Sequence, residues 1–143
     1  MRPHSLVLAL MGATLALTIT TNAKSPYAVP SAADDVQVIN VTAKKYEFNP
    51  SPIQVKAGTR VQLRITATDR AHGFKISEFP EGVDDHGKPG LIFSSPQDCW
   101  KLEKNQPLAV EFVAQIPGTY AFKCCVHCGL HHGSMKGELI VVP

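Results

Sequence analysis

Hydrophobic and polar residues alternate along several short segments of this chain, most clearly from residue 61 to residue 67. That segment reads Val-Gln-Leu-Arg-Ile-Thr-Ala, and residues 108–112 repeat the same period with Leu, Val and Phe. A period of two is typical of a β-strand that buries one face and exposes the other. By the same reasoning, further strands are expected at residues 36–41, 53–56, 72–76, 119–123 and 137–142.

Turn-forming residues separate these segments, among them Asn-Pro-Ser-Pro at 49–52, Ala-Gly-Thr at 57–59 and Pro-Gly at 117–118. Roughly seven or eight short strands with turns between them, and no convincing helix, predict an all-β domain. The fold class we expect is an antiparallel Greek-key β-sandwich. Residues 77–106 are rich in proline and glycine and show little regular pattern. We expect a long loop there, either functional or packed on itself.

The N-terminal end has the features of an export signal. A positive residue, Arg2, precedes an apolar run at residues 6–19, and a small residue, Ala23, offers a cleavage point. A membrane anchor is the alternative, but a spanning helix needs about 20 apolar residues and this run is shorter. We therefore expect a signal peptide at 1–23, a flexible lead-in at 24–35 and one folded domain at 36–143.

Composition excludes some classes of function and location. The 143 residues suit one domain, and the net charge of +2 creates no strong field toward nucleic acid or a membrane surface. We expect no nucleic-acid partner and no membrane span once the signal is removed. Export then predicts a secreted protein, with the bacterial periplasm as its location.

Four cysteines, Cys99, Cys124, Cys125 and Cys128, carry the candidate chemistry. Outside the cytoplasm paired cysteines usually form disulfides. Three of these four lie within five residues, and adjacent cysteines rarely bridge each other, because a disulfide needs facing Cβ atoms. The cluster therefore fits metal ligands better. Cys99 could pair with Cys125, and the sequence leaves this open.

Soft donors surround these cysteines. Cys124, Cys128, His132 and Met135 follow the spacing Cys-x3-Cys-x3-His-x2-Met, between two predicted strands. Thiolate, imidazole and thioether together favour copper, since a weak methionine ligand is typical of copper electron-transfer sites. Zinc is the rival metal for cysteine and histidine, but it seldom takes a thioether.

This spacing resembles the CuA loop of cytochrome c oxidase subunit II and of nitrous oxide reductase. The Gly after the second cysteine and the Met-Lys-Gly before the last strand are also similar to that family. Upstream, Asp69-Arg-Ala-His72 resembles the Asp-x-x-His segment that supplies a further histidine. From residue 36 to residue 142 the pattern resembles a cupredoxin domain.

The resemblance implies a metal-ligand set of six residues: His72, Cys124, the carbonyl of Val126, Cys128, His132 and Met135. The two thiolates would bridge two copper ions. His72 and Met135 would complete one ion, and His132 with the Val126 carbonyl the other. Such a site carries electrons and does not transform substrates, so the implied partner is a c-type cytochrome or a terminal oxidase.

Three other interpretations remain open. The spacing of Cys124, His127 and His132 is also similar to nitrosocyanin, a red-copper protein with one copper, in which case Met135 would not be a ligand. A blue-copper site would use Cys128 and leave Cys124 as a spare thiol. A copper chaperone or scavenger would bind one Cu(I) exchangeably. An enzyme is the least favoured class, since the sequence has no open coordination position and no catalytic triad.

Overall fold

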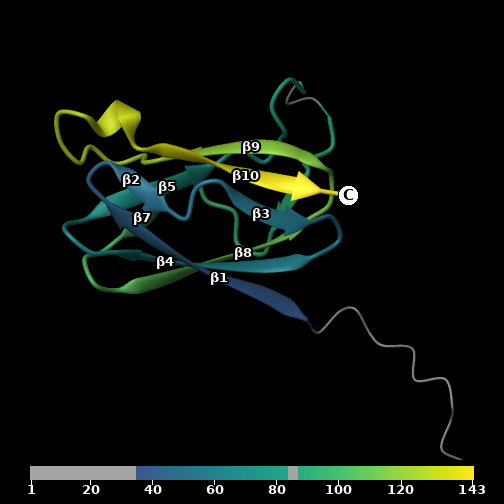
Figure 1. Cartoon of the computed structure of the whole chain (residues 1–143), viewed down its shortest axis with the longest axis horizontal. Helices are drawn as coiled ribbons and strands as arrows, with labels where there is room; N and C mark the ends of the chain where they lie inside the picture. The colour runs from purple at the N-terminus through teal and green to yellow at the C-terminus, as the bar shows by residue number, and fades with distance from the viewer. Residues whose placement is uncertain (1–34, 84–86) are drawn as a thin grey trace, which may run out of the picture. The chain divides into compact units, whose positions relative to one another are not determined.

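The computed structural model describes residues 35–83 and 87–143 (Figure 1). The predicted signal peptide and all but the last residue of the predicted lead-in lie outside the described residues. The described part contains ten strands: β1 (Val36–Lys44), β2 (Glu47–Asn49), β3 (Ile53–Lys56), β4 (Arg60–Ala67), β5 (His72–Ile76), β6 (Leu91–Phe93), β7 (Trp100–Leu102), β8 (Pro107–Ala114), β9 (Gly118–Lys123) and β10 (Lys136–Val142).

These strands form two facing sheets, so the all-β sandwich is confirmed (Figure 1). One sheet has the order β2-β1-β4-β8-β6 and the other the order β3-β10-β9-β5-β7. Most strand pairs are antiparallel, but β1 runs parallel to β4 and β3 runs parallel to β10. The chain crosses to the second sheet for β3 and returns for β4, which brings β4 beside β1 in the same direction.

The alternating side chains explain why the sheets pack face to face. In β4, Val61, Leu63 and Ile65 are all fully buried, as the sequence pattern predicts. An aromatic cluster fills the middle of the core, where the ring of Phe48 meets Phe74 and Phe122 edge-on with centroids 5.7 and 5.4 Å apart. The core therefore holds β5 and β9, the two strands that lead to the candidate site, in fixed positions.

Residues 77–106 are more regular than the sequence suggested. The expected long loop contains β6, which pairs with β8, and β7, which pairs with β5. Strands of three residues are too short to show an alternating pattern, which is why they escaped prediction. Trp100 in β7 is buried against Phe74 and Phe93, so this segment packs on the sandwich.

The only helical element of the described residues is a single 3-10 turn, η1 (His132–Ser134). Accordingly, no helix in the described part of the chain has the length and apolar character needed to span a membrane.

Candidate metal centre

All the predicted ligands except His72 lie at one end of the sandwich, in the loop of residues 124–135 between β9 and β10, which we call the metal loop (Figure 1). Its two ends are held together, because the Cys124 N–H donates to the Met135 carbonyl at 2.9 Å and so continues the β9–β10 ladder. Within the loop, η1 shortens the path back to β10, with the N–H of Met135 donating to the carbonyl of His132 at 3.1 Å.

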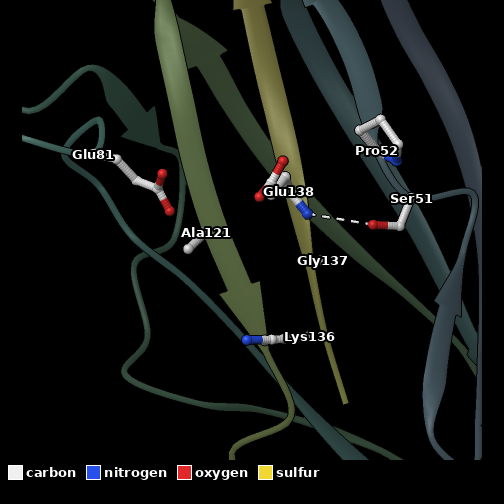
Figure 2. A pocket seen from close by; sticks show the side chains of 7 residues that line it. All are labelled: Ser51, Pro52, Glu81, Ala121, Lys136, Gly137 and Glu138. Atoms are coloured by element: carbon white, nitrogen blue, oxygen red, sulfur yellow. Dashed lines mark hydrogen bonds between the residues drawn. The ribbon is translucent and has the colours of Figure 1, made fainter. Parts of the chain in front are cut away.

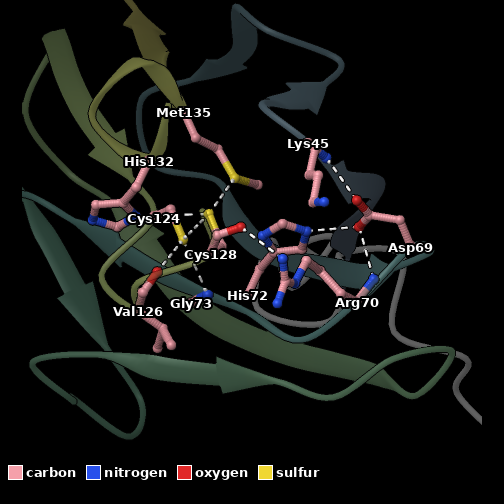
Figure 3. A network of polar contacts seen from close by, with 10 residues as sticks. All are labelled: Lys45, Asp69, Arg70, His72, Gly73, Cys124, Val126, Cys128, His132 and Met135. Carbon is pink, nitrogen blue, oxygen red and sulfur yellow. Dashed lines mark hydrogen bonds and ion pairs between the residues drawn. The ribbon is translucent and has the colours of Figure 1, made fainter. Parts of the chain in front are cut away.

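Two unpaired thiols form the centre of the site. Cys124 and Cys128 are both buried and free, and their Sγ atoms lie 3.7 Å apart (Figure 3). A disulfide bond is about 2.05 Å long, so these sulfurs are in contact but not bonded. The thioether of Met135 lies 3.8 Å from the Cys128 sulfur and is itself buried. Three sulfur atoms therefore meet in one buried position.

A histidine from a different strand completes this cluster. The His72 side chain, at the start of β5, is fully buried, and its Nε2 lies 2.7 Å from the Asp69 carboxylate. Its Nδ1 is buried and has no hydrogen-bond partner. One ring nitrogen of His72 and the sulfurs of Cys124 and Cys128 all lie within 4.8 Å of one another. Figure 3 shows one ring nitrogen directed at Asp69 and the other toward the sulfurs.

Asp69 determines which nitrogen of His72 is available. Burial alone would raise the pKa of this carboxyl group. The hydrogen bond with His72 and those donated by the N–H groups of Lys45 and Arg70 lower it to about 2. The ionised carboxylate accepts a hydrogen bond from the Nε2–H of His72, which leaves the lone pair of the imidazole on Nδ1, facing the sulfurs. A buried nitrogen without a hydrogen-bond partner in that position fits a metal ligand.

His132 approaches the sulfurs from another side. Its Nδ1 lies 3.6 Å from the Cys128 sulfur, yet it is not part of the mutually close group that contains His72. In Figure 3 the two sulfurs lie between the rings of His132 and His72. The Val126 carbonyl oxygen is 3.1 Å from the Cys124 sulfur, so a backbone oxygen that could bind a metal ion also lies beside the sulfurs. The structure thus brings together all six predicted ligand residues.

The surroundings of the two thiols affect the pKa of Cys128 and provide hydrogen bonds to the metal loop. Burial, and then the neighbouring thiol of Cys124, raise the pKa of Cys128 to about 11. The Gly73 N–H points at the Cys124 sulfur from 3.4 Å, and Arg70 Nη1 donates to the Cys128 carbonyl at 3.2 Å. The Cys128 sulfur therefore keeps its proton until a metal ion replaces it, and metal binding there must release a proton.

His127, the ligand of the red-copper alternative, lies outside the group of buried ligand atoms formed by His72, Cys124 and Cys128. Its side chain is exposed and its ring contacts that of His132, with centroids 5.8 Å apart. It does not belong to the close group of ligand atoms found among the described residues. The next histidine, His131, is also exposed, and its ring packs against Tyr46 with centroids 5.3 Å apart.

Tyr46 is a neighbour of the site that the sequence did not reveal. Besides contacting His131, it lies so close to Gly129 that a Cβ atom there would be 2.7 Å from its hydroxyl oxygen. Gly129 also has a φ of +134°, which strongly favours glycine. From the sequence, a glycine directly after Cys128 could indicate that another part of the chain approaches the loop closely. It could not indicate that the approaching residue is Tyr46.

The remaining two cysteines form a disulfide between Cys99 and Cys125, which resolves the pairing that the sequence left open. This bond ties the metal loop to the segment just before β7. It lies against β5, because a Cβ atom on Gly73 would be only 2.6 Å from the Cys125 sulfur. With these two paired, Cys124 and Cys128 remain available for metal.

Comparison with known proteins agrees with this geometry. The family profile described as the cupredoxin-like domain matches residues 7–141, so the chain belongs to this family. A curated relative, cytochrome c oxidase subunit 2 of Thermus thermophilus, is 26% identical over 129 residues, covering 85% of this chain and 82% of the relative.

Solved structures with the same fold include copper proteins and an oxidase domain. Auracyanin A, a blue copper protein of Chloroflexus aurantiacus, matches with a TM-score of 0.56 and 19% identity, covering 76% of this chain and all of its own. The periplasmic domain of cytochrome oxidase subunit II of Bradyrhizobium japonicum also has a TM-score of 0.56, at 17% identity, covering 74% of this chain and 83% of its own. At these identities the likeness shows the fold.

The donor set itself selects the metal. Two thiolates, imidazole and a thioether are soft ligands that suit copper, and the family relationship with oxidase subunit II points the same way. Copper binding is thus supported both by the donor atoms of the site and by the family to which the chain belongs. The number of ions that the site holds is a separate question.

Proposed function

We propose that this chain is a copper-binding electron-transfer protein with a two-copper centre of the CuA type. One observation carries the proposal: two buried, unbonded thiols lie 3.7 Å apart and histidine rings approach them from two sides. A metal–sulfur bond is about 2.3 Å long, as in zinc sites, and the sulfur separation is less than twice that. Both sulfurs can therefore reach the same ion.

Each residue then has a defined task. The thiolates of Cys124 and Cys128 would be shared by the two ions. His72 Nδ1 and the Met135 thioether would hold one ion, and His132 Nδ1 with the Val126 carbonyl would hold the other. The separation of the two histidines is supported by the contacts, because the ligand nitrogens of His72 and His132 do not share one close group. The places of Met135 and Val126 follow the resemblance to the CuA loop.

When bound, a copper pair bridged by two thiolates shares one electron between both metals, so each ion changes its charge little. The chain contributes rigidity. The core-packed strand β5 holds His72, Asp69 fixes its tautomer, and the β9–β10 ladder clamps both ends of the metal loop. Ligands fixed in this way do not move between oxidation states, which is the requirement for rapid electron transfer rather than for catalysis.

The setting that we propose is outside the cytoplasm, with residues 1–23 as an export signal and 36–143 as the copper domain. One observation supports it: a disulfide joins Cys99 and Cys125, and disulfides persist in oxidising compartments. The curated relative is an oxidase subunit, which supports a terminal oxidase or a c-type cytochrome as the redox partner.

One observation favours a site with a single copper ion. The sulfur of Cys128 contacts both His132 Nδ1 at 3.6 Å and the Met135 sulfur at 3.8 Å, as a blue-copper ligand would. This candidate leaves Cys124 without a role, although its buried thiol lies at the centre of the cluster. We therefore place it second.

Counting copper per chain separates the two candidates. Anaerobic titration of the refolded protein with copper, followed by metal analysis, should give two ions per chain. Cys124→Ser should abolish the paired site, whereas His127→Ala, a matched change of an exposed histidine in the same loop, should leave two ions. One ion per chain in the wild type, unchanged by Cys124→Ser, would eliminate the two-copper proposal. Loss of copper from His127→Ala would favour the red-copper alternative.

A further inference from the structure

Three lysines form a row across the outer face of the second sheet. In the β5–β9 pair Lys75 lies opposite Lys123, and in the β9–β10 pair Lys123 lies opposite Lys136. All three side chains are exposed. We call these three residues the lysine row.

No ion pair among the described residues involves the row. Like charges directly opposite each other destabilise a sheet. The ion pairs found among the described residues are Lys44 with Glu47 and Asp69 with His72, and neither involves the row. A position that costs stability without local compensation is a candidate for a contact with another molecule.

The lysine row lies beside the metal loop. Lys123 immediately precedes Cys124, and Lys136 immediately follows Met135. A hollow of about 340 Å³ is lined by all three lysines together with Ser77, Ala121 and Phe122. A second hollow, of about 400 Å³, is lined by Lys123, Cys125 and Gly133 and by three proposed ligands, Cys124, His132 and Met135. The charged surface is thus continuous with an opening toward the copper ligands.

The charge on this face changes sign away from the metal loop. Glu138 lies opposite Ala121, two residues further along β10 from the metal loop than Lys136, which lies opposite Lys123. Glu81 lines the same open groove as Glu138, and Figure 2 shows the two carboxylates on either side of β9 while Lys136 lies toward the other end. The lysine row therefore lies next to the metal centre, and these two carboxylates lie further along the face from the metal loop.

We propose that the lysine row docks an acidic surface of the redox partner protein, with partner carboxylates seated between the lysines beside the metal loop. This rests on the proposed electron-transfer function and adds the partner's chemistry to it. Charge complementarity steers such partners together and fixes their orientation, at rates that fall with added salt. A protein partner fits better than a membrane, because polybasic lipid sites gather four to eight basic residues and this row has three.

A nuclear magnetic resonance titration tests the docking surface without copper. The probe is poly-L-glutamate, added to the full chain in its metal-free, disulfide-bonded form at low salt. Amide shifts should concentrate at residues 75, 123 and 136 and should vanish as salt is raised. Lys123→Glu, at the centre of the row, should weaken binding about tenfold. The control Lys56→Glu makes the same charge change at the far end of the same sheet, where Lys56 pairs with Val142, and should leave binding unchanged.

A second assay tests orientation in the copper-loaded protein. Anionic hexacyanoferrate should react faster with the wild type at low salt than at high salt, and Lys123→Glu should remove that salt dependence. Cationic hexaammineruthenium should react more slowly with the wild type at low salt than at high salt. Lys123→Glu should melt no lower than the wild type, because it relieves two like-charge contacts, so lost binding cannot be attributed to unfolding.

The proposal is overturned if poly-L-glutamate shifts spread evenly over the surface, or if Lys56→Glu weakens binding as much as Lys123→Glu. Binding to vesicles that contain phosphatidylglycerol, without binding to poly-L-glutamate, would assign the row to a membrane and would also overturn it. The titration uses no copper, so its outcome is independent of whether the site holds one ion or two.

Discussion

Removing the disulfide should cost the metal-free protein a definite amount of stability. The Cys99–Cys125 bond closes a loop with a sequence separation of 26 residues. In the chain-entropy description, a loop of that length restricts the unfolded chain by about 3.5 kcal/mol at 25 °C. The double variant Cys99→Ser/Cys125→Ser should therefore unfold with a free energy lower by about that amount.

Equilibrium urea unfolding of the metal-free protein, followed by tryptophan fluorescence, measures this difference, since Trp100 is buried next to the bond. Reductant should destabilise the wild type by the same amount, because it opens the same loop. Reductant should have no effect on the double variant, which is the control for nonspecific effects on Cys124 and Cys128. A double variant within about 1 kcal/mol of the wild type would refute the reasoning.

The remaining predictions concern residues that position the copper ligands. Asp69→Asn should lower copper affinity about 10- to 100-fold, because the amide no longer fixes the tautomer of His72. A competition titration with a copper chelator measures the affinity, and an unchanged value would contradict the prediction. Gly73→Ala should destabilise the protein by about 1–3 kcal/mol, since the new methyl group would lie 2.6 Å from the Cys125 sulfur. Thermal unfolding tests it, and Gly133→Ala, where the same group meets open space, is the matched control.

The long strands could be predicted from the sequence because their pattern repeats several times. In β4 the alternation spans the whole strand, and the buried residues are those that the pattern places inward. In contrast, β6 and β7 are three residues long and form only because β8 and β5 offer free edges. The parallel pairing of β1 with β4 depends on how the chain crosses between sheets, which no local pattern encodes.

The candidate site was predictable to the extent that it is local. Cys124, Cys128, His132 and Met135 follow one another in a short loop, so their spacing alone suggested a metal site. The distant His72 could be added through the resemblance to a known segment. The sequence could not decide the Cys99–Cys125 pair, because a disulfide depends on Cβ positions in the fold.

The lysine row was equally invisible in the sequence. Its members are far apart along the chain and meet only through the register of three adjacent strands. A shift of one residue in that register would turn a charged side chain into the core. Surface features of this kind require the fold before they can be recognised.

Electron spin resonance of the copper-loaded wild type, prepared with one electron fewer than the fully reduced protein, tests the central claim most directly. If Cys124 and Cys128 bridge two ions, the unpaired electron should interact equally with two copper nuclei, and the signal should represent half of the copper present. A spectrum with the hyperfine pattern of one copper nucleus, accounting for all the copper, would contradict the two-copper centre.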